Sequence, residues 1–385
     1  MYEEFFMNII GLVAEYNPFH NGHKYQIETI KKMYPDSVII VVLSSSFTQR
    51  GEISVLDKWE KTDIALNNKI DLVVELPYVF STESADTFAH ASIKMLNELK
   101  IDTLVFGSES DDTDLFFKLA KAQIENKEFD DLVNKYFKEG NNYPTALSKA
   151  LKEITNEEID KPNDLLAISY TKEILKINKK INIVSIKRTN NFHDISGTSK
   201  IVSASNIRNK MYNGKKIKKY VPKDTYLYLK NKKVNYNKMY ELLKYKINDS
   251  NDLSIFQTVD EGIENRITDK INNTNSVEEL IKEIKTKRYT YNKISRMLSH
   301  ILIGFTKNDK KKFKEPSYIR ILGMSEEGKK HLNRIKKETK LPIISKFKTD
   351  EEILQFELKV TKIYSQIVDN PSLIEKEYKN NIIKK

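Results

Sequence analysis

The chain of 385 residues contains no cysteine, one tryptophan and only six histidines. Without cysteine it cannot form disulfides, thiolate metal sites or cysteine nucleophiles, and this composition fits a cytoplasmic protein. No apolar run approaches the roughly 20 residues that a membrane helix needs, so we expect no membrane partner. The sequence also lacks a Walker A motif and a G-x-G-x-x-G, which disfavours P-loop and dinucleotide-binding folds.

The N-terminus lacks the features of a secretory leader. Acidic residues stand in the segment Met1–Phe6, where a signal peptide needs basic ones, and no cleavage site follows. Met7 offers an alternative start, in which case residues 1–6 are an extension of the native chain. We therefore expect the protein to stay in the cytoplasm.

Positive charge is abundant, but it is confined to the second half of the chain. The net charge at neutral pH is +11. Residues 1–210 sum to about −5 and residues 211–385 to about +16. Such a basic half predicts a polyanionic partner, and nucleic acid is the first candidate. The alternative is a lysine-rich composition in which the lysines only solvate helix surfaces.

Short apolar runs alternate with amphipathic helical stretches in the first half. Runs rich in Val, Ile and Leu with few charges are typical of strands buried on both faces. They lie at Ile9–Ala14, Val38–Leu43, Asp71–Leu76, Asp102–Phe106 and Asn182–Ile186, and helical patterns such as His23–Met33, Lys58–Asn67 and Ser84–Leu99 separate them. This alternation predicts an α/β fold with a doubly wound parallel sheet, whose ligand binds beyond the carboxyl ends of the strands.

The pattern changes after Gly214, at an Asn-Gly-Lys-Lys turn. Lysine-rich helical patterns follow, and strand-like runs are confined to a short α/β piece between residues 319 and 345. We therefore predict two domains, an α/β domain over residues 1–214 and a mostly helical, basic domain over residues 215–385. No obligate protein partner is evident from the sequence.

Two histidines flank an Asn-Gly pair directly after the first predicted strand. In this strand–turn–helix order, the backbone N–H groups and the positive end of a helix dipole gather around His20 and His23. Gly22 allows close approach of a ligand, and histidines with pKa values near neutral suit phosphate oxygens. A phosphate site is therefore favoured over a metal site, because no third metal ligand stands at a usual spacing. A purely structural role for one histidine stays open.

A second anion cradle is predicted at the segment Ser-Ala-Ser-Asn-Ile-Arg-Asn-Lys, residues 203–210. Ser203 or Ser205 can cap a helix, and Arg208 lies in its first turn. Alone this signal is weak, because serine-capped helices with an arginine are common. Together with His20 and His23 it resembles the nucleotidylyltransferase superfamily, whose hallmarks are H-x-G-H after the first strand and a Ser/Thr-rich turn ending in Arg or Lys after the fifth.

Longer segments resemble one family within that superfamily, the bacterial tRNA(Met) cytidine acetate ligases. They read GLVAEYNPFHNGH (11–23), QRGEISVLDKWEKTDIAL (49–66), DLVVELP (71–77), FGSE (106–109), KPNDLLAISY (161–170), TKRYTYNKISRMLSHIL (286–302) and IRILGMSEEGKKHL (319–332). The resemblance implies a nucleotidylyltransferase Rossmann-like fold. It also implies that ATP, with Mg²⁺, activates acetate as acetyl-adenylate, and that the acetyl group passes to N4 of the wobble cytidine (C34) of elongator tRNA(Met).

The resemblance also implies which residues act. His20, His23 and Arg208 would be catalytic, with no metal bound directly by the protein. The residues implied to hold ATP are Val13, Ala14, Glu15, Tyr16, Asn17, Pro18, Phe19, His20, Asn21, Gly22, His23, Lys24, Tyr25, Gln26, Gly107, Asn163, Arg188 and Ser203.

Several of these positions have a structural alternative. Gly107 could be a plain turn glycine, Asn163 a helix N-cap after Pro162, and Arg188 a partner of Asp194. The family's arginine in the Lys-Trp-x-Arg-Thr segment is lysine here, at residue 61. This change is mild.

The tRNA contacts are expected in the basic half, where Lys287, Arg288 and Arg296 lie among tyrosines. Tyr289 and Tyr291 could either stack on bases or pack in the core, and the sequence favours neither. Lys58 and Trp59 could contact the cytosine or tRNA, although a core position is favoured for Trp59.

Two further functions remain open on sequence alone. One is a small-molecule nucleotidylyltransferase, although such enzymes are usually shorter and lack a basic helical half. The other is an RNA-binding protein with a regulatory nucleotide site, against which the intact His20, His23 and Arg208 argue.

Overall fold

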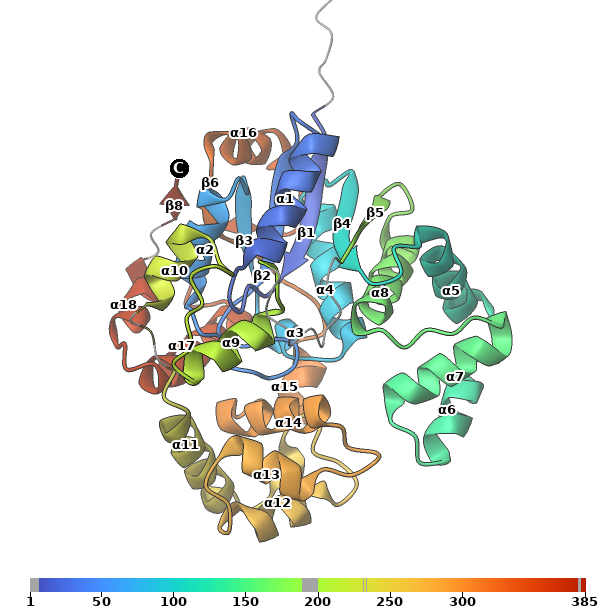
Figure 1. Ribbon diagram of the computed structural model, residues 1–385, viewed down its shortest axis with the longest axis vertical. Helices are drawn as coiled ribbons and strands as arrows, with labels where there is room; N and C mark the ends of the chain where they lie inside the picture. The colour runs from blue at the N-terminus through green and yellow to red at the C-terminus, as the bar shows by residue number, and fades with distance from the viewer. Residues whose placement is uncertain (1–6, 189–199, 231, 233, 380–381) are drawn as a thin grey trace, which may run out of the picture.

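Five parallel strands form the centre of the computed structural model, which describes residues 7–188, 200–230, 232, 234–379 and 382–385 (Figure 1). Their order across the sheet is β5-β4-β1-β2-β3. The strands are β1 (Ile9–Ala14), β2 (Val38–Ser44), β3 (Leu72–Leu76), β4 (Thr103–Ser108) and β5 (Asn182–Lys187). All five predicted strands are therefore confirmed, with ends that shift by at most two residues.

Helices cover both faces of this sheet, as the prediction of a doubly wound fold requires. Right-handed crossovers place α1 (Asn21–Met33) and α2 (Lys58–Asn67) on one face, and α4 (Ala85–Glu98) and α8 (Pro162–Ile177) on the other. The carboxyl ends of the strands β1, β4 and β5 thereby meet at one edge of the sheet. The short helix α3 (Tyr78–Ser81) follows β3 directly.

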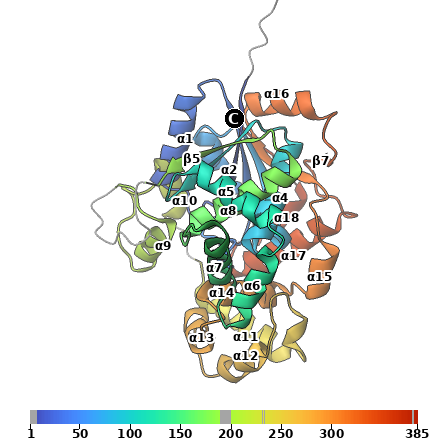
Figure 2. The same cartoon turned by 90° about the vertical axis from the view of Figure 1, so that its right-hand side faces the viewer.

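Three helices are inserted before α8, and two of them form a hairpin that projects beyond the sheet. They are α5 (Thr113–Glu125), α6 (Phe129–Lys138) and α7 (Tyr143–Thr155). Both views place α6 and α7 on the side of the sheet where the basic helices lie (Figures 1 and 2). The hairpin therefore stands beside the carboxyl ends of the strands.

The basic half is mostly helical, as predicted, and the helices α11 to α15 lie below the sheet in Figure 1. After α9 (Ala204–Tyr212) and α10 (Lys223–Leu229) come α11 (Tyr236–Asp249), the short η1 (Leu253–Ile255), α12 (Ile263–Ile271), α13 (Val277–Ile284), α14 (Tyr291–Ile303) and α15 (Lys307–Lys312). Within the described ranges, no helix is both long and apolar enough to cross a membrane.

The chain then returns to the first sheet. Strand β6 (Ile319–Met324) pairs antiparallel with β3, and β7 (Ile343–Ile344) and β8 (Ile383–Lys384) pair with β6. Helices α16 (Glu326–Ile335), α17 (Glu352–Ile367) and α18 (Ser372–Lys379) accompany them. The predicted α/β piece thus extends the main sheet rather than standing alone, and a domain boundary at residue 214 stays a prediction.

A buried charge cluster fixes this return. The Arg320 guanidinium on β6 pairs with Glu75 of β3 at 3.1 Å and with Glu377 of α18 at 2.6 Å. Lys58 of α2 bonds to the same two carboxylates, and all four side chains are almost fully buried. Because removing one of these charges would leave the buried cluster with an uncompensated charge, the cluster holds the C-terminal segment on the sheet.

Candidate active site

The turn between β1 and α1 carries the histidine pair. His20 is the N-cap of α1, and its Nδ1 accepts a hydrogen bond from the Gly22 N–H at 3.0 Å. The His23 Nδ1 accepts from the His20 N–H at 3.2 Å, and the two rings stack with their centroids 3.8 Å apart. A structural role, which the sequence left open for one histidine, is therefore confirmed for both rings, because both cap the helix.

This capping also fixes the tautomers. Because each Nδ1 accepts a backbone N–H, each neutral ring carries its proton on Nε2, where it can be donated to a ligand. Burial, followed by the charge of Arg188, lowers the pKa of His20 to about 3. Burial, followed by the field of His20, lowers the pKa of His23 well below its usual value. The expected near-neutral pKa values are wrong: both histidines are neutral donors at pH 7.

The glycine between the histidines is required by packing. A Cβ on Gly22 would lie 2.8 Å from Cε1 of the His20 ring. Asn21 anchors the turn from the other side, because its Nδ2 donates to the carbonyls of Lys200 and Lys219, each at 2.9 Å. The side chain of Asn21 thus holds the segments before and after α9 against the start of α1.

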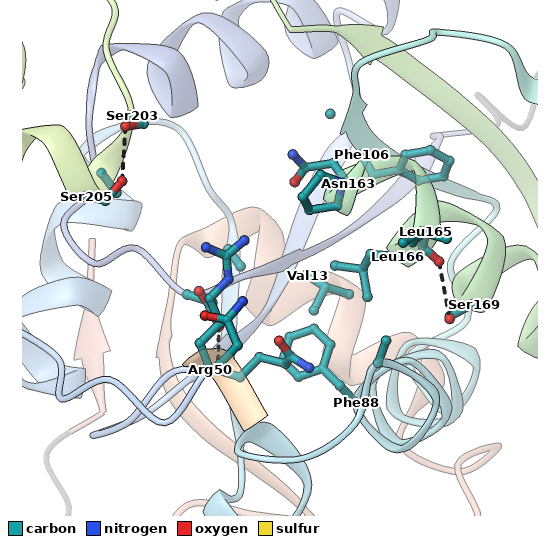
Figure 3. Close-up of a pocket in the computed structure, with 18 of the residues that line it drawn as sticks. Val13, Arg50, Phe88, Phe106, Asn163, Leu165, Leu166, Ser169, Ser203 and Ser205 are labelled. Carbon is teal, nitrogen blue, oxygen red and sulfur yellow. Dashed lines mark hydrogen bonds between the residues drawn. The ribbon is translucent and has the colours of Figure 1, made fainter. Parts of the chain in front are cut away.

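Helix α9 presents the second predicted cradle. Ser203 is its N-cap and accepts from the Asn206 N–H at 3.3 Å, while Ser205 lies 3.1 Å from the Ser203 hydroxyl (Figure 3). Arg208 donates to the Asn17 carbonyl at 2.7 Å and pairs with Glu52 at 2.5 Å. Its guanidinium is therefore held beside the β1–α1 turn, as the pairing of the two motifs predicts.

The ends of β4 and β5 supply the third part of the site. A Cβ on Gly107 would lie 3.5 Å from the Arg188 side chain, so the two residues are in contact. The N-cap of α8 is Lys161, which rules out the capping alternative for Asn163. Asn163 instead donates to Glu109 at 2.5 Å. Asp194, the alternative partner of Arg188, lies outside the described residues.

A buried aspartate sets the position of this β4 loop. Asp164 of α8 accepts hydrogen bonds from the Ser108 hydroxyl and from the N–H groups of Glu109 and Ser110, at distances of 2.7 to 3.3 Å. The loop that follows Gly107 is therefore tied to the start of α8, next to Asn163.

One cavity of about 730 Å³ joins the three parts (Figure 3). Its lining includes the following residues implied to hold ATP: Val13, Ala14, Glu15, Tyr16, Asn17, His20, Gly22, His23, Tyr25, Gln26, Gly107, Asn163, Arg188 and Ser203. Arg208 lines it as well. Pro18, Phe19, Asn21 and Lys24 do not: Phe19 is in the core, and Lys24 faces Glu28 on the surface of α1.

Residues of the basic half also reach this cavity. Arg296 of α14 lines it and donates to the Gln49 carbonyl at 3.5 Å. Arg288 lines it too, pairs with Glu261 at 2.7 Å and lies 4.4 Å over the Phe137 ring of α6. Lys287 is exposed and does not line the cavity. The helical half therefore forms one wall of the site.

The two tyrosines beside these cations differ in burial, so one belongs to the core and the other lies on the surface. Tyr289 is buried and donates to the Asp260 carbonyl at 2.6 Å, so it belongs to the core. Tyr291, at the start of α14, is 39% exposed and stays available to a partner.

The segment around residue 58 is structural. Trp59 is buried, as favoured, and Lys58 belongs to the charge cluster of Arg320. The possibility that either side chain contacts the cytosine or tRNA is therefore contradicted by their burial. Lys61 donates from Nζ to the carbonyls of Glu15, Ser44 and Ser45 at 2.6 to 3.0 Å. Burial lowers the pKa of Lys61 to about 7. Through its three hydrogen bonds, Lys61 joins the ends of β1 and β2.

Sequence reasoning missed Arg50 and the α6–α7 hairpin. Phe137, Tyr143 and Leu147 of this hairpin line the cavity. Only their place in the fold brings them there, since nothing in the local sequence marks them. Across the described ranges, no group of three or more His, Asp or Glu side chains is arranged to hold a metal ion.

The sheet order, the H-x-G-H turn and the cradle of α9 define a nucleotidylyltransferase. Residues 7–380 match the model of the family described as HIGH Nucleotidyl Transferase. The chain is 35% identical to the tRNA(Met) cytidine acetate ligase of Geobacillus sp. strain WCH70, over 97% of this chain and 98% of the relative. It is 37% identical to that of Thermoanaerobacter sp. strain X514, over 98% and 100%.

Solved structures agree with this assignment. The crystal structure of Thermotoga maritima TmcAL bound with alpha-thio ATP has a TM-score of 0.87 and 28% identity, covering 98% of this chain and 100% of that one. The apo form of the same enzyme has a TM-score of 0.89. The chain belongs to the tRNA(Met) cytidine acetate ligase family, and it is a ligase.

Proposed function

We propose that this protein is an ATP-dependent acetate–tRNA ligase that forms N4-acetylcytidine at the wobble position (C34) of elongator tRNA(Met). The observation that carries the proposal is the shared cavity. His20, His23 and Arg208 lie in it together with Arg288 and Arg296 of the basic half. The cavity that would hold the nucleotide therefore has cationic side chains of the basic half in its wall, and these suit RNA phosphates.

In the first step, a carboxylate oxygen of acetate attacks the α-phosphorus of ATP. The new oxygen–phosphorus bond gives acetyl-adenylate, and the bond to the bridging oxygen breaks, so that its electron pair leaves with diphosphate. Two anions must meet in this step, and the Nε2–H donors of His20 and His23 can stabilise the charge without being cations themselves. Arg208 and the N-terminus of α9 supply positive charge from the other side.

In the second step, N4 of the cytosine attacks the acetyl carbon and AMP leaves, with loss of a proton from the nitrogen. The cytosine amine is a poor nucleophile because its lone pair is delocalised into the ring, so an activated anhydride is needed. The wobble base lies in a loop, and placing it in a pocket costs less than extrusion from a duplex. Lys287, Arg288 and Arg296 are the proposed contacts to the tRNA backbone.

Magnesium enters this proposal as part of the substrate MgATP. Since the described residues hold no carboxylate cluster arranged for a metal, the phosphate oxygens would carry the ion. When bound there, it neutralises charge on the phosphates.

The direct test is incubation with ATP, labelled acetate and total bacterial tRNA, followed by digestion of the RNA. Label in N4-acetylcytidine supports the proposal. Diphosphate release that ignores tRNA but needs a phosphorylated metabolite would instead indicate a small-molecule nucleotidylyltransferase. ATP binding without turnover would indicate a regulatory site.

A further inference from the structure

Three partly exposed aromatic rings come from three different helices near the candidate active site. Tyr212 ends α9, Tyr236 begins α11 and Tyr291 begins α14. Their exposed fractions are 46%, 38% and 39%. The rings of Tyr212 and Tyr236 meet edge to face with their centroids 5.0 Å apart, and their hydroxyls are hydrogen-bonded to each other. The first two rings therefore form one aromatic surface on the outside of the protein.

All three tyrosines lie around one ion pair of the cavity wall. Partial burial raises the pKa of each phenol, and the charges of Arg208 and Glu52 act on the pKa of all three. Because charges in salt solution are screened over about 10 Å, the three hydroxyls lie close to this pair. Arg208 and Glu52 line the cavity, and so do Thr290 and Asn292 on either side of Tyr291. Exposed rings that gather beside a cavity, unlike scattered ones, are typical of a contact site.

A run of lysines follows Tyr212. Between α9 and α10 stand four exposed lysines, namely Lys215, Lys216, Lys218 and Lys219. The start of α1 holds this run in place, because the backbone N–H of Asn21 donates to the Tyr220 carbonyl at 3.0 Å and its side chain donates to the Lys219 carbonyl at 2.9 Å. Since Asn21 directly follows His20, the lysines lie beside the turn that carries the histidine pair.

Cations next to exposed aromatic rings match the chemistry of single-stranded RNA. Lysines neutralise its phosphates, and its unpaired bases stack on aromatic side chains. An RNA duplex offers phosphates to the lysines but keeps the faces of its bases inside the stack. An acidic peptide offers charge alone. Only an unpaired segment of RNA would therefore use both the lysines and the tyrosines.

We propose that the Tyr212–Tyr236 pair, together with Tyr291, stacks with an unpaired base of the anticodon loop, and that the lysines between α9 and α10 hold the phosphates of this loop. The loop then lies over the edge of the cavity, so that its wobble base enters while a neighbouring base stays stacked outside. The contact with Tyr236 orders the Tyr212 ring before RNA binds, which lowers the entropic cost of stacking. This assignment rests on the proposed function, because it takes tRNA as the substrate.

The test measures the Kd of the full-length protein for a transcript of elongator tRNA(Met) by filter binding. Tyr212→Ala should raise this Kd by about 5- to 100-fold, whereas Tyr212→Phe, which keeps the ring, should stay within about threefold of the wild type. Tyr291→Ala tests the surface from a second helix and should raise the Kd by about fivefold or more. The Kd for a fully paired RNA duplex should change in neither alanine variant, because a duplex presents no unpaired base.

The matched control is Tyr245→Ala. Tyr245 is 66% exposed and lies on the same helix as Tyr236, but the nine residues between them turn its side chain to the opposite face. This variant should leave the Kd for tRNA unchanged.

The lysines are tested separately by the double variant Lys215→Gln/Lys216→Gln. It should weaken the binding of tRNA and of the duplex alike, and reduce the salt slope of tRNA binding by about one to two, because phosphate contacts are lost. An unchanged slope would overturn the phosphate contacts.

An unchanged Kd for tRNA in Tyr212→Ala and Tyr291→Ala would overturn the stacking assignment, and so would an equal loss of affinity for the duplex. Either result, with a wild type that still forms N4-acetylcytidine, leaves the proposed function standing. A wild type that does not bind tRNA would overturn the proposed function itself, and the assignment with it.

Discussion

The charge state of His20 makes a quantitative prediction about stability. In the folded protein the pKa of His20 is lowered to about 3 by burial and then by Arg188, whereas in the unfolded chain it returns to its usual 6.5. As the pH falls below 6.5, the unfolded state binds a proton that the folded state refuses, so stability is lost. Between pH 7.5 and pH 5 this one group lowers the free energy of unfolding by about 2 kcal/mol.

The assay is urea unfolding of the wild type and of His20→Asn at both pH values. Asparagine is a good N-cap, so α1 keeps a cap while the titrating group is removed. The gap in free energy of unfolding between the two proteins should therefore shift by about 2 kcal/mol across this range, in favour of the variant at pH 5. A gap that stays constant would refute the reasoning, because it would mean that His20 titrates near 6.5 in the folded protein.

Three further predictions concern the catalytic pair, the basic wall and the charge cluster. His23→Gln should slow acetate-dependent diphosphate exchange by about 10²- to 10³-fold through loss of an oriented donor, and an equal loss of tRNA affinity would contradict the separate roles. Arg288→Gln should raise the KM for tRNA and reduce the salt slope of tRNA binding by about one charge in a filter-binding assay; an unchanged slope would exclude a phosphate contact. Arg320→Met should lower the free energy of unfolding by about 3 kcal/mol or more by leaving Glu75 and Glu377 short of a partner, whereas Lys379→Gln on the exposed face of α18 should change it by less than about 0.5 kcal/mol. Equal effects of the last two would mean that the cluster does not hold the C-terminal segment.

The sequence was sufficient to predict the five parallel strands and the part of the site formed by His20, His23 and Arg208. The strands β1 to β4 are mostly buried, so their apolar runs are easily recognised, whereas the edge strand β5 is partly exposed. Because ligands bind at the carboxyl ends of parallel strands, His20, His23 and Arg208 could be expected to meet. Their place around one cavity agrees with that expectation.

Other features depend on tertiary contacts that no local pattern encodes. The strand at 319–324 was recognisable, but its pairing with β3 depends on Arg320 meeting Glu75 and Glu377 from distant segments. The neutral state of the histidines follows from burial, which their sequence neighbours do not reveal. Arg50 lines the cavity from a loop whose Gly51 packs on α14, a contact between distant parts of the chain.

The central claim is that an oxygen of the acid attacks the α-phosphorus of ATP in this cavity. Acetate labelled with ¹⁸O in both oxygens tests it directly, in a reaction with ATP and tRNA(Met) analysed by mass spectrometry. The mechanism predicts that each AMP formed carries one ¹⁸O atom, because the carboxylate oxygen stays on phosphorus when the acetyl group leaves. AMP without the label, or label found in a phosphate released together with ADP, would contradict it.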